Sequence, residues 1–180
     1  DRGVRARVGR GGVRASLIRR HAPAPADGVC AAVVCARMPT DHESITRLVY
    51  LYAERLDLGD LEGVAELFTH ATLRSNHRED GLRGRDAVLG LYRDTVQMHD
   101  GIPSTKHVTT NVIVEVDAGG TGAGARSYFT VLQARPDLTL QPIIAGRYHD
   151  RFEKAADGWR FSDRMILVDL IGDLRRHLKM

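Results

Sequence analysis

Two residues in this sequence have the chemistry and the surroundings of an acid–base pair. Asp57 follows Val49 and Ala53 at four-residue intervals, so it falls at the end of an apolar helical stripe. A carboxyl group buried in apolar surroundings has a raised pKa, which suits proton transfer near neutral pH. His107 stands at the start of a stretch of alternating residues, and an ordinary imidazole titrates near neutrality. Together they predict a site that removes water from a substrate or moves a proton beside a carbonyl group.

Both residues also have a structural interpretation, which the sequence leaves open. Asp57 could form an ion pair with Arg164, or it could cap the turn at Leu58–Asp60. A single histidine such as His107 often makes hydrogen bonds inside a protein without taking part in chemistry.

Five further polar residues could contact a substrate. We expect Tyr52 to act as an orienting hydrogen-bond donor beside Asp57, and Tyr128 and Tyr148 to donate to a substrate oxygen. Asn111 could orient the substrate, while Arg164 could meet a carboxylate or form an internal ion pair. The remaining histidines lack the spacing of a ligand set, so we expect neither a metal nor a cofactor.

Helices are predicted in the first half of the chain. Thr40 and Glu43 match a capping box, which predicts a helix that starts there and ends at Gly59. A short helix over residues 60–68 and a third over about 85–98 follow. Between them we expect a short strand near residues 72–75 and then a loop as far as Gly84.

Strands are predicted after Pro103, where the apolar period changes to two. They cover residues 106–116, 125–135, 143–153 and 159–169, with a last helical turn at 173–178. In the first of them, His107, Asn111 and Ile113 are expected on one face, pointing into a concavity if the valine face is the outer one. Helices followed by an antiparallel meander predict an α+β fold, with the helices in the concavity of a curved sheet.

Several short motifs, in this order and spacing, resemble the SnoaL-like family of the nuclear transport factor 2-like superfamily over residues 40–172. They are Tyr52-Ala53, Asp57-x-Gly59-Asp60, Gly84-Arg85-Asp86-Ala87, Lys106-His107-x3-Asn111, Gly146-Arg147-Tyr148-x-Asp150 and Gly158-Trp159-Arg160-Phe161. The resemblance implies a cone-shaped, cystatin-like fold around an apolar pocket, and a homodimer formed through the outer face of the sheet. Relatives include scytalone dehydratase, bile-acid dehydratase and ketosteroid isomerase.

The dehydratase-like relatives fit this sequence best. In them a tyrosine and an aspartate of the first helix contribute to the pocket, which matches Tyr52 and Asp57, and a histidine is frequent at the place of His107. The second long strand differs, because it has Thr130 and Val131 but no second histidine or carboxylate.

The basic charge of the chain is concentrated at its beginning. The net charge is +3 over 180 residues, yet residues 1–37 hold eight arginines against two aspartates, so the rest is slightly acidic. We expect residues 1–39, rich in Arg, Gly, Ala and Pro, to be disordered, and residues 40–180 to form the domain. The first segment could be a targeting sequence, a nucleic-acid-binding arm or a sequence foreign to the native protein, which would then begin at Met38.

The sequence therefore predicts a small cofactor-independent lyase or isomerase that acts on a hydrophobic polycyclic, steroid-like or polyketide-like molecule. The alternative is a non-catalytic module of the same fold that binds a hydrophobic ligand or assembles with a partner. We expect a cytoplasmic homodimer that spans no membrane, and nucleic acid is not an expected partner of the folded part.

Overall fold

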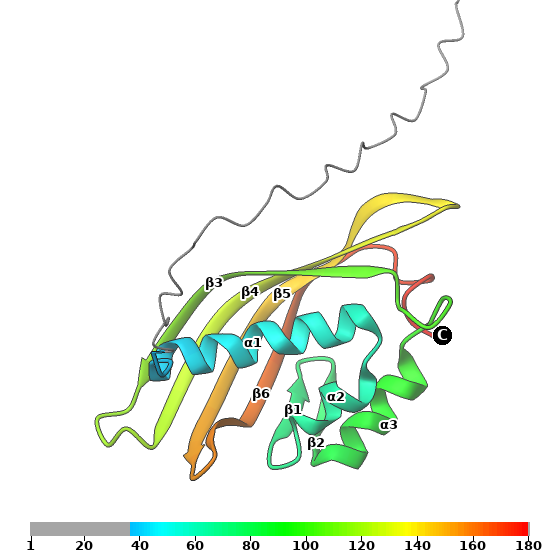
Figure 1. The fold of residues 1–180 in the computed structure, drawn as a ribbon. Helices are drawn as coiled ribbons and strands as arrows, with labels where there is room; N and C mark the ends of the chain where they lie inside the picture. Colours follow the sequence, from blue (N-terminus) through cyan, green and yellow to red (C-terminus); the bar gives the residue numbers. More distant parts are fainter. Residues whose placement is uncertain (1–36, 180) are drawn as a thin grey trace, which may run out of the picture. The chain divides into compact units, whose positions relative to one another are not determined.

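The computed structural model describes residues 37–179 (Figure 1). The elements follow in the order α1 (Asp41–Leu58), α2 (Leu61–Glu66), β1 (Thr72–Ser75), β2 (Arg78–Arg83), α3 (Arg85–Thr95), β3 (Thr105–Val116), β4 (Gly122–Arg135), β5 (Leu138–Ala155) and β6 (Gly158–Ile171). The predictions for residues 1–36 lie outside the described part of the chain. None of the described helices is long and apolar enough to cross a membrane.

Helix α1 begins and ends where the sequence predicts. The Glu43 amide donates to the Thr40 hydroxyl, and the Thr40 amide donates to the Glu43 carboxylate, so the capping box is formed. Gly59 ends the helix at φ 75°, a left-handed conformation that glycine adopts without strain. Ile45, Val49 and Tyr52 lie on its buried face.

The six strands form one sheet in the order β2-β1-β6-β5-β4-β3. All neighbours are antiparallel except β1 and β6, which are parallel. The loop expected before Gly84 is wrong in part, because Arg78–Arg83 forms strand β2 and pairs with β1. Its charged sequence has no alternating apolar pattern, so only pairing with β1 specifies it as a strand.

A bulge in β3 changes which residues face inward. The pairing of β3 with β4 shifts between Thr110 and Ile113, and Asn111 adopts φ 53°. Beyond the bulge Val112 and Val114 pack against the core, while Ile113 is exposed. The prediction that Asn111 and Ile113 share the inward face of His107 is therefore wrong, since an extra residue reverses the alternation.

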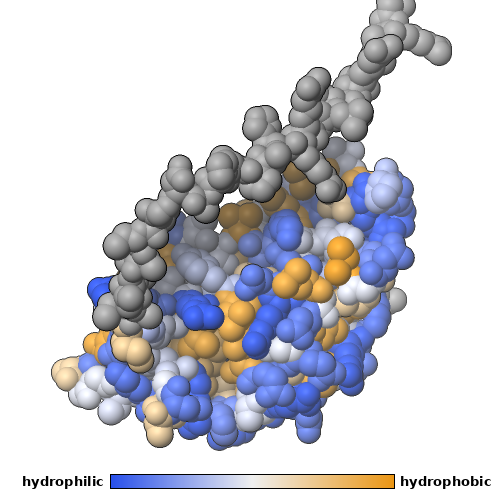
Figure 2. All heavy atoms as spheres, viewed as in Figure 1, coloured by the Kyte–Doolittle hydropathy of each residue, from blue (hydrophilic) through white to orange (hydrophobic). Residues whose placement is uncertain are grey.

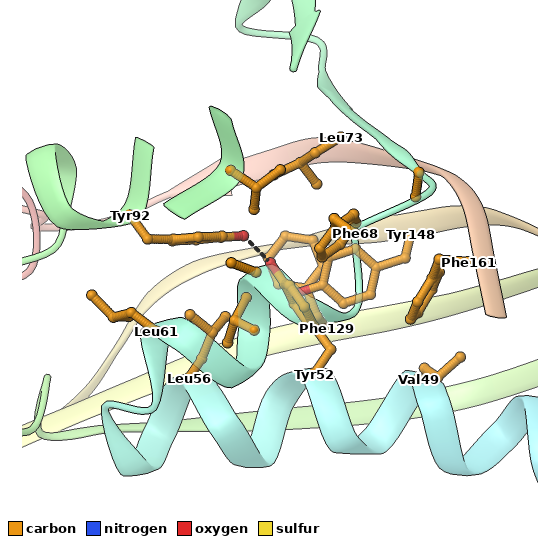
Figure 3. Packing of buried hydrophobic residues seen from close by; sticks show 14 of the residues in the cluster. Val49, Tyr52, Leu56, Leu61, Phe68, Leu73, Tyr92, Phe129, Tyr148 and Phe161 are labelled. Atoms are coloured by element: carbon orange, nitrogen blue, oxygen red, sulfur yellow. Dashed lines mark hydrogen bonds between the residues drawn. The ribbon is translucent and has the colours of Figure 1, made fainter. Parts of the chain in front are cut away.

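The helices lie against the concave face of the curved sheet, as predicted for an α+β fold (Figure 1). Aromatic rings join the two layers: Phe68, which follows α2, stacks on Phe161 of β6 with ring centres 5.5 Å apart. Tyr52 of α1 meets Tyr148 of β5 edge to face at 5.8 Å (Figure 3). Burial of these rings provides much of the apolar area that holds helix and sheet together.

Candidate active site

A cavity of about 450 Å³ lies at one end of the space between the helices and the concave face. Its wall comes from helices α1 and α3, the β1–β2 hairpin, strands β3 to β6 and the C-terminal segment. Most of the wall is apolar, including Leu56, Leu91, Val96, Phe129, Val131, Ile144, Ile166, Val168 and Leu178. On the side of the molecule that Figure 2 shows, hydrophobic residues gather in the middle of the surface and hydrophilic ones surround them. An apolar pocket with a few polar groups is typical of a site for a small organic molecule.

The predicted pair is formed at the start of β3. Nδ1 of His107 lies 2.7 Å from Oδ1 of Asp57, and the backbone amide of His107 donates to Oδ2 at 2.8 Å. The hydroxyl of Thr105 donates to Oδ1 at 2.9 Å. Helix α1 supplies the carboxylate, and β3 supplies all three donors, so the packing of α1 on β3 builds the pair.

The pKa of Asp57 is lowered, contrary to the expectation that burial would raise it. Burial does act in that direction, but the hydrogen bonds from His107 and Thr105 and the charge interaction with His107 outweigh it. Asp57 is therefore a carboxylate at neutral pH and can only accept hydrogen bonds. It follows that Nδ1 of His107 donates to this carboxylate, so whenever the ring has a single proton, that proton is on Nδ1 and the free lone pair is on Nε2.

The two members of the pair are placed differently with respect to the cavity. Both border a groove between α1 and β3 on the outside, but only His107 also lines the cavity. The imidazole is thus the group that can meet a ligand, and the carboxylate positions it. The sequence predicted that Asp57 itself exchanges a proton with the substrate, whereas this geometry favours a positioning role for Asp57.

Tyr52 contributes a hydroxyl to the cavity together with a residue that sequence reasoning missed. Its oxygen lies 2.6 Å from the hydroxyl oxygen of Tyr92 on α3 (Figure 3), and both residues line the cavity. Burial raises the pKa of Tyr52, and burial together with Tyr52 raises the pKa of Tyr92 well above its ordinary value. Tyr92 lies on the buried face of α3. A tyrosine buried on a helix face needs a partner for its hydroxyl, and that requirement was the signal available in the sequence.

Tyr148 lies in the cavity wall and Arg164 does not. Arg164 is fully buried and makes two hydrogen bonds to Asp150, of 2.8 and 2.6 Å. Its guanidinium carbon stands 4.2 Å from the ring centres of both Tyr52 and Tyr148. The internal ion pair considered for Arg164 is therefore present, but with Asp150 and not with Asp57.

Tyr128 and Asn111, which the sequence predicts to contact a substrate, do not line the cavity that His107 lines. Tyr128 is 53% exposed, because the residues of β4 alternate and Phe129 takes the inward position next to it. Asn111 is exposed at the bulge of β3. Both residues border a shallow hollow on the outer, convex face of the sheet.

The C-terminal segment adds His177 to the cavity wall, and the turn between β1 and β2 adds His77; the sequence indicated neither. Residues 173–178 form the predicted turn, with the amides of His177 and Leu178 donating to the carbonyl of Leu174. His177 lines the same cavity as His107, although the two are far apart in the sequence. Only the folding back of the chain end onto α3 and β3 brings them together.

Within residues 37–179 no group of three or more His, Cys, Asp or Glu side chains is arranged to hold a metal ion. The cavity wall contains instead three histidines, one arginine, three tyrosines and three smaller hydroxyl side chains, namely His77, His107, His177, Arg78, Tyr52, Tyr92, Tyr148, Ser75, Thr95 and Thr105.

A model of the SnoaL-like domain matches residues 37–165. Among solved structures, an NTF2-like protein with a cystatin-like fold from Novosphingobium aromaticivorans is 24% identical with a TM-score of 0.62, over 71% of this chain and 81% of that one. A protein of unknown function from Mycobacterium tuberculosis is 26% identical with a TM-score of 0.58, over 71% of each chain. A candidate scytalone dehydratase from N. aromaticivorans is 21% identical with a TM-score of 0.59, over 74% of this chain and 87% of that one. No curated protein matches the sequence significantly.

Proposed function

The chain belongs to the SnoaL-like family, and we propose that it is a cofactor-independent lyase or isomerase that uses acid–base chemistry on a hydrophobic ring compound. The observation that carries this proposal is the imidazole of His107, which faces an apolar cavity and is fixed from behind by the carboxylate of Asp57. A carboxylate in this position selects the tautomer in which Nε2 is a base, and it stabilises the imidazolium that forms.

The proposed reaction is the elimination of water from a β-hydroxy ketone. Nε2 of His107 takes the proton from the carbon between the carbonyl and the carbinol carbon, and the electron pair moves toward the carbonyl oxygen. The enolate then expels the hydroxyl group as the C–O bond breaks, and the imidazolium returns its proton to this leaving group. The products are water and a conjugated ketone, and His107 is again uncharged.

The tyrosine pair suits the enolate oxygen that forms in this reaction. Two hydroxyl groups carry two protons, and only one is used in the hydrogen bond between Tyr52 and Tyr92. Because their raised pKa values keep both hydroxyls protonated at neutral pH, the second proton is available to a substrate oxygen.

The test uses 3-hydroxy-1-tetralone, a bicyclic β-hydroxy ketone whose loss of water yields 1-naphthol after tautomerisation. We expect the full chain to accelerate the formation of 1-naphthol and His107→Gln to lower the rate by about 100-fold, since a positioned general base typically contributes this much. His149→Gln is the matched control, because His149 is exposed and borders the hollow on the convex face.

Two outcomes contradict the proposal. One is a His107→Gln variant that keeps the full rate. The other is a parent chain that binds 1-tetralone, the analogue without the leaving group, but does not dehydrate the hydroxy ketone. The second outcome favours the non-catalytic binding module of the same fold.

A further inference from the structure

We propose that His177 is a ligand-binding residue, whose ring N–H donates a hydrogen bond to a carbonyl oxygen of the molecule held in the cavity. The kind of ligand rests on the proposed function. The C-terminal segment 173–179 is then one wall of the site and not merely the end of the chain.

The first support is that this segment is fastened at several points. The backbone amide of Gln97 donates to the carbonyl of His177 at 2.8 Å, and the amide of Lys179 donates to the carbonyl of Thr95 at 2.8 Å. The side-chain amide of Gln133 reaches from β4 and donates to the carbonyl of Arg176 at 3.0 Å. His177 is therefore held in place by its backbone, and its side chain is not needed for this purpose.

The second support is an unused polar atom. Nδ1 of His177 is buried and has no hydrogen-bond partner among the described residues. A buried polar group without a partner lowers the stability of the fold, and such groups in native structures call for an explanation. Nδ1 is shielded from the cavity as well, so the nitrogen left for a ligand is Nε2, and with no acceptor beside Nδ1 the uncharged ring can carry its N–H there.

The third support is the charge state of the ring. Burial lowers the pKa of His177 to about 4, and repulsion from His107 on β3 and from His99 adds to this, while Asp57 on α1 acts in the opposite direction. At neutral pH the ring is uncharged, so it has one N–H and one lone pair. A neutral imidazole can polarise a carbonyl group without delivering a proton to it.

His107 and His177, two of the three histidines that line the cavity, thus have different tasks. His107 is backed by a carboxylate that stabilises its protonated form, whereas His177 has no acidic partner of its own among the described residues. The expected ligand is an apolar ring system with a carbonyl oxygen close to the acidic carbon. The acidic carbon meets His107, and the oxygen, which has two lone pairs, accepts from His177 as well as from the tyrosine pair.

The experiment compares two compounds of nearly the same shape, 1-tetralone and tetralin, of which only the first has a carbonyl group. Calorimetry on the full chain is expected to show that His177→Leu weakens the binding of 1-tetralone about tenfold, the effect of one lost hydrogen bond, and leaves tetralin unchanged. His177→Gln, which retains an N–H donor, is expected to recover part of the loss. His149→Leu is the control for the substitution itself.

Nuclear magnetic resonance of the 15N-labelled imidazoles provides a second readout. The ring nitrogens of His177 are expected to shift when 1-tetralone is added and to stay in place when tetralin is added. Three results would each overturn the proposal: His177→Leu loses equal affinity for both compounds, it loses affinity for neither, or the ring nitrogens of His177 do not shift. A side chain that only packs against the ligand cannot distinguish a compound with a carbonyl group from one without.

The outcomes also separate this proposal from the one on which it rests. A chain that holds 1-tetralone through His177 but does not dehydrate 3-hydroxy-1-tetralone supports the contact and contradicts the lyase. A chain that dehydrates the hydroxy ketone while His177→Leu binds 1-tetralone with parental affinity supports the lyase and overturns the contact.

Discussion

Three donors converge on the two oxygens of Asp57, and this arrangement decides how the site works. Oδ1 accepts from the Thr105 hydroxyl and from Nδ1 of His107, while Oδ2 accepts from the His107 amide. No such cluster follows from the spacing of an aspartate on a helix and a histidine on a strand. It lowers the pKa of a carboxyl group that burial alone would raise, so Asp57 is an acceptor at neutral pH.

Asp57→Asn is expected to affect both stability and turnover. Whichever way the amide is turned, its NH2 group faces one of the three donors, so the free energy of unfolding should fall by about 1–3 kcal/mol. The rate of 1-naphthol formation should fall by about 100-fold or more, because the required tautomer of His107 is no longer selected. Urea unfolding and the rate of dehydration measure the two effects.

Thr105→Val is the control for the change at Asp57. It removes one hydrogen bond to Oδ1 but leaves both contacts with His107. We expect the free energy of unfolding to fall by about 1 kcal/mol and the rate of 1-naphthol formation to change little. Full activity in Asp57→Asn would show that the carboxylate has only a structural role.

His177 makes the stability of the fold depend on pH. Below pH 6.5 the unfolded chain takes up a proton at this residue, whereas the folded chain does not do so until about pH 4. Stability therefore falls as the pH decreases through this window, because the unfolded state binds more protons. When the pH is lowered from about 7 to about 5, the free energy of unfolding of His177→Gln should fall by about 1–2 kcal/mol less than that of the parent chain. Urea unfolding at the two pH values measures this difference. An identical decline in both chains would mean that His177 titrates normally.

At the scale of the elements, a buried ion pair joins the two central strands behind the cavity. Arg164 of β6 and Asp150 of β5 stand opposite each other in the ladder, and both side chains are almost completely buried. The aromatic rings of Tyr52, Tyr148 and Phe161 surround the guanidinium. The pair thus holds the guanidinium against these three rings, which pack between α1 and the sheet.

Asp150→Asn is expected to lower the free energy of unfolding by about 3–5 kcal/mol, since it leaves the charge of Arg164 buried without a counter-ion. Chemical denaturation measures the loss. The double variant Asp150→Leu with Arg164→Met removes both charges and should recover much of this stability. The single variants Asp150→Leu and Arg164→Met are measured separately for comparison. If their losses of unfolding free energy add up to the loss of the double variant, the two side chains are not coupled.

At the scale of the whole molecule, the described domain has an apolar row on the convex face of its sheet. Val108, Thr130, Ala145 and Leu170 are neighbours in register across β3, β4, β5 and β6. Val108 is 44% exposed and Leu170 69%, and Tyr128 lies beside them. Exposed apolar patches of this kind frequently mark protein interfaces. We propose that two copies of the chain pair through this face.

Tyr128→Glu is expected to convert the dimer to a monomer, because it places a charge in the middle of the proposed interface. Sedimentation or light scattering measures the mass. Tyr50→Glu is the matched control, since Tyr50 is exposed to a similar degree on the outer side of α1. A parent chain that is monomeric at high concentration would contradict the proposal, as would a Tyr128→Glu variant that remains a dimer.

The sequence by itself determined the elements whose signals are local. The capping box at Thr40 and the glycine at the end of α1 set the bounds of that helix, because the groups that satisfy its free amides and carbonyls are adjacent in the chain. The alternating period predicted the four long strands, and the order of helices and strands predicted the fold class. Asp57 and His107 were found because each stood out against its own helix or strand pattern.

Only the tertiary structure decided which of the other candidates share the site. The bulge at Asn111 reverses which residues of the second half of β3 face the core. No local sequence pattern reveals it, because the pairing with β4 decides where an extra residue is accommodated. Tyr92 and His177 join the cavity from elements distant in the sequence, and their partners are chosen by packing. The lowered pKa of Asp57 has the same origin, since the donors that cause it come from a strand about 50 residues away.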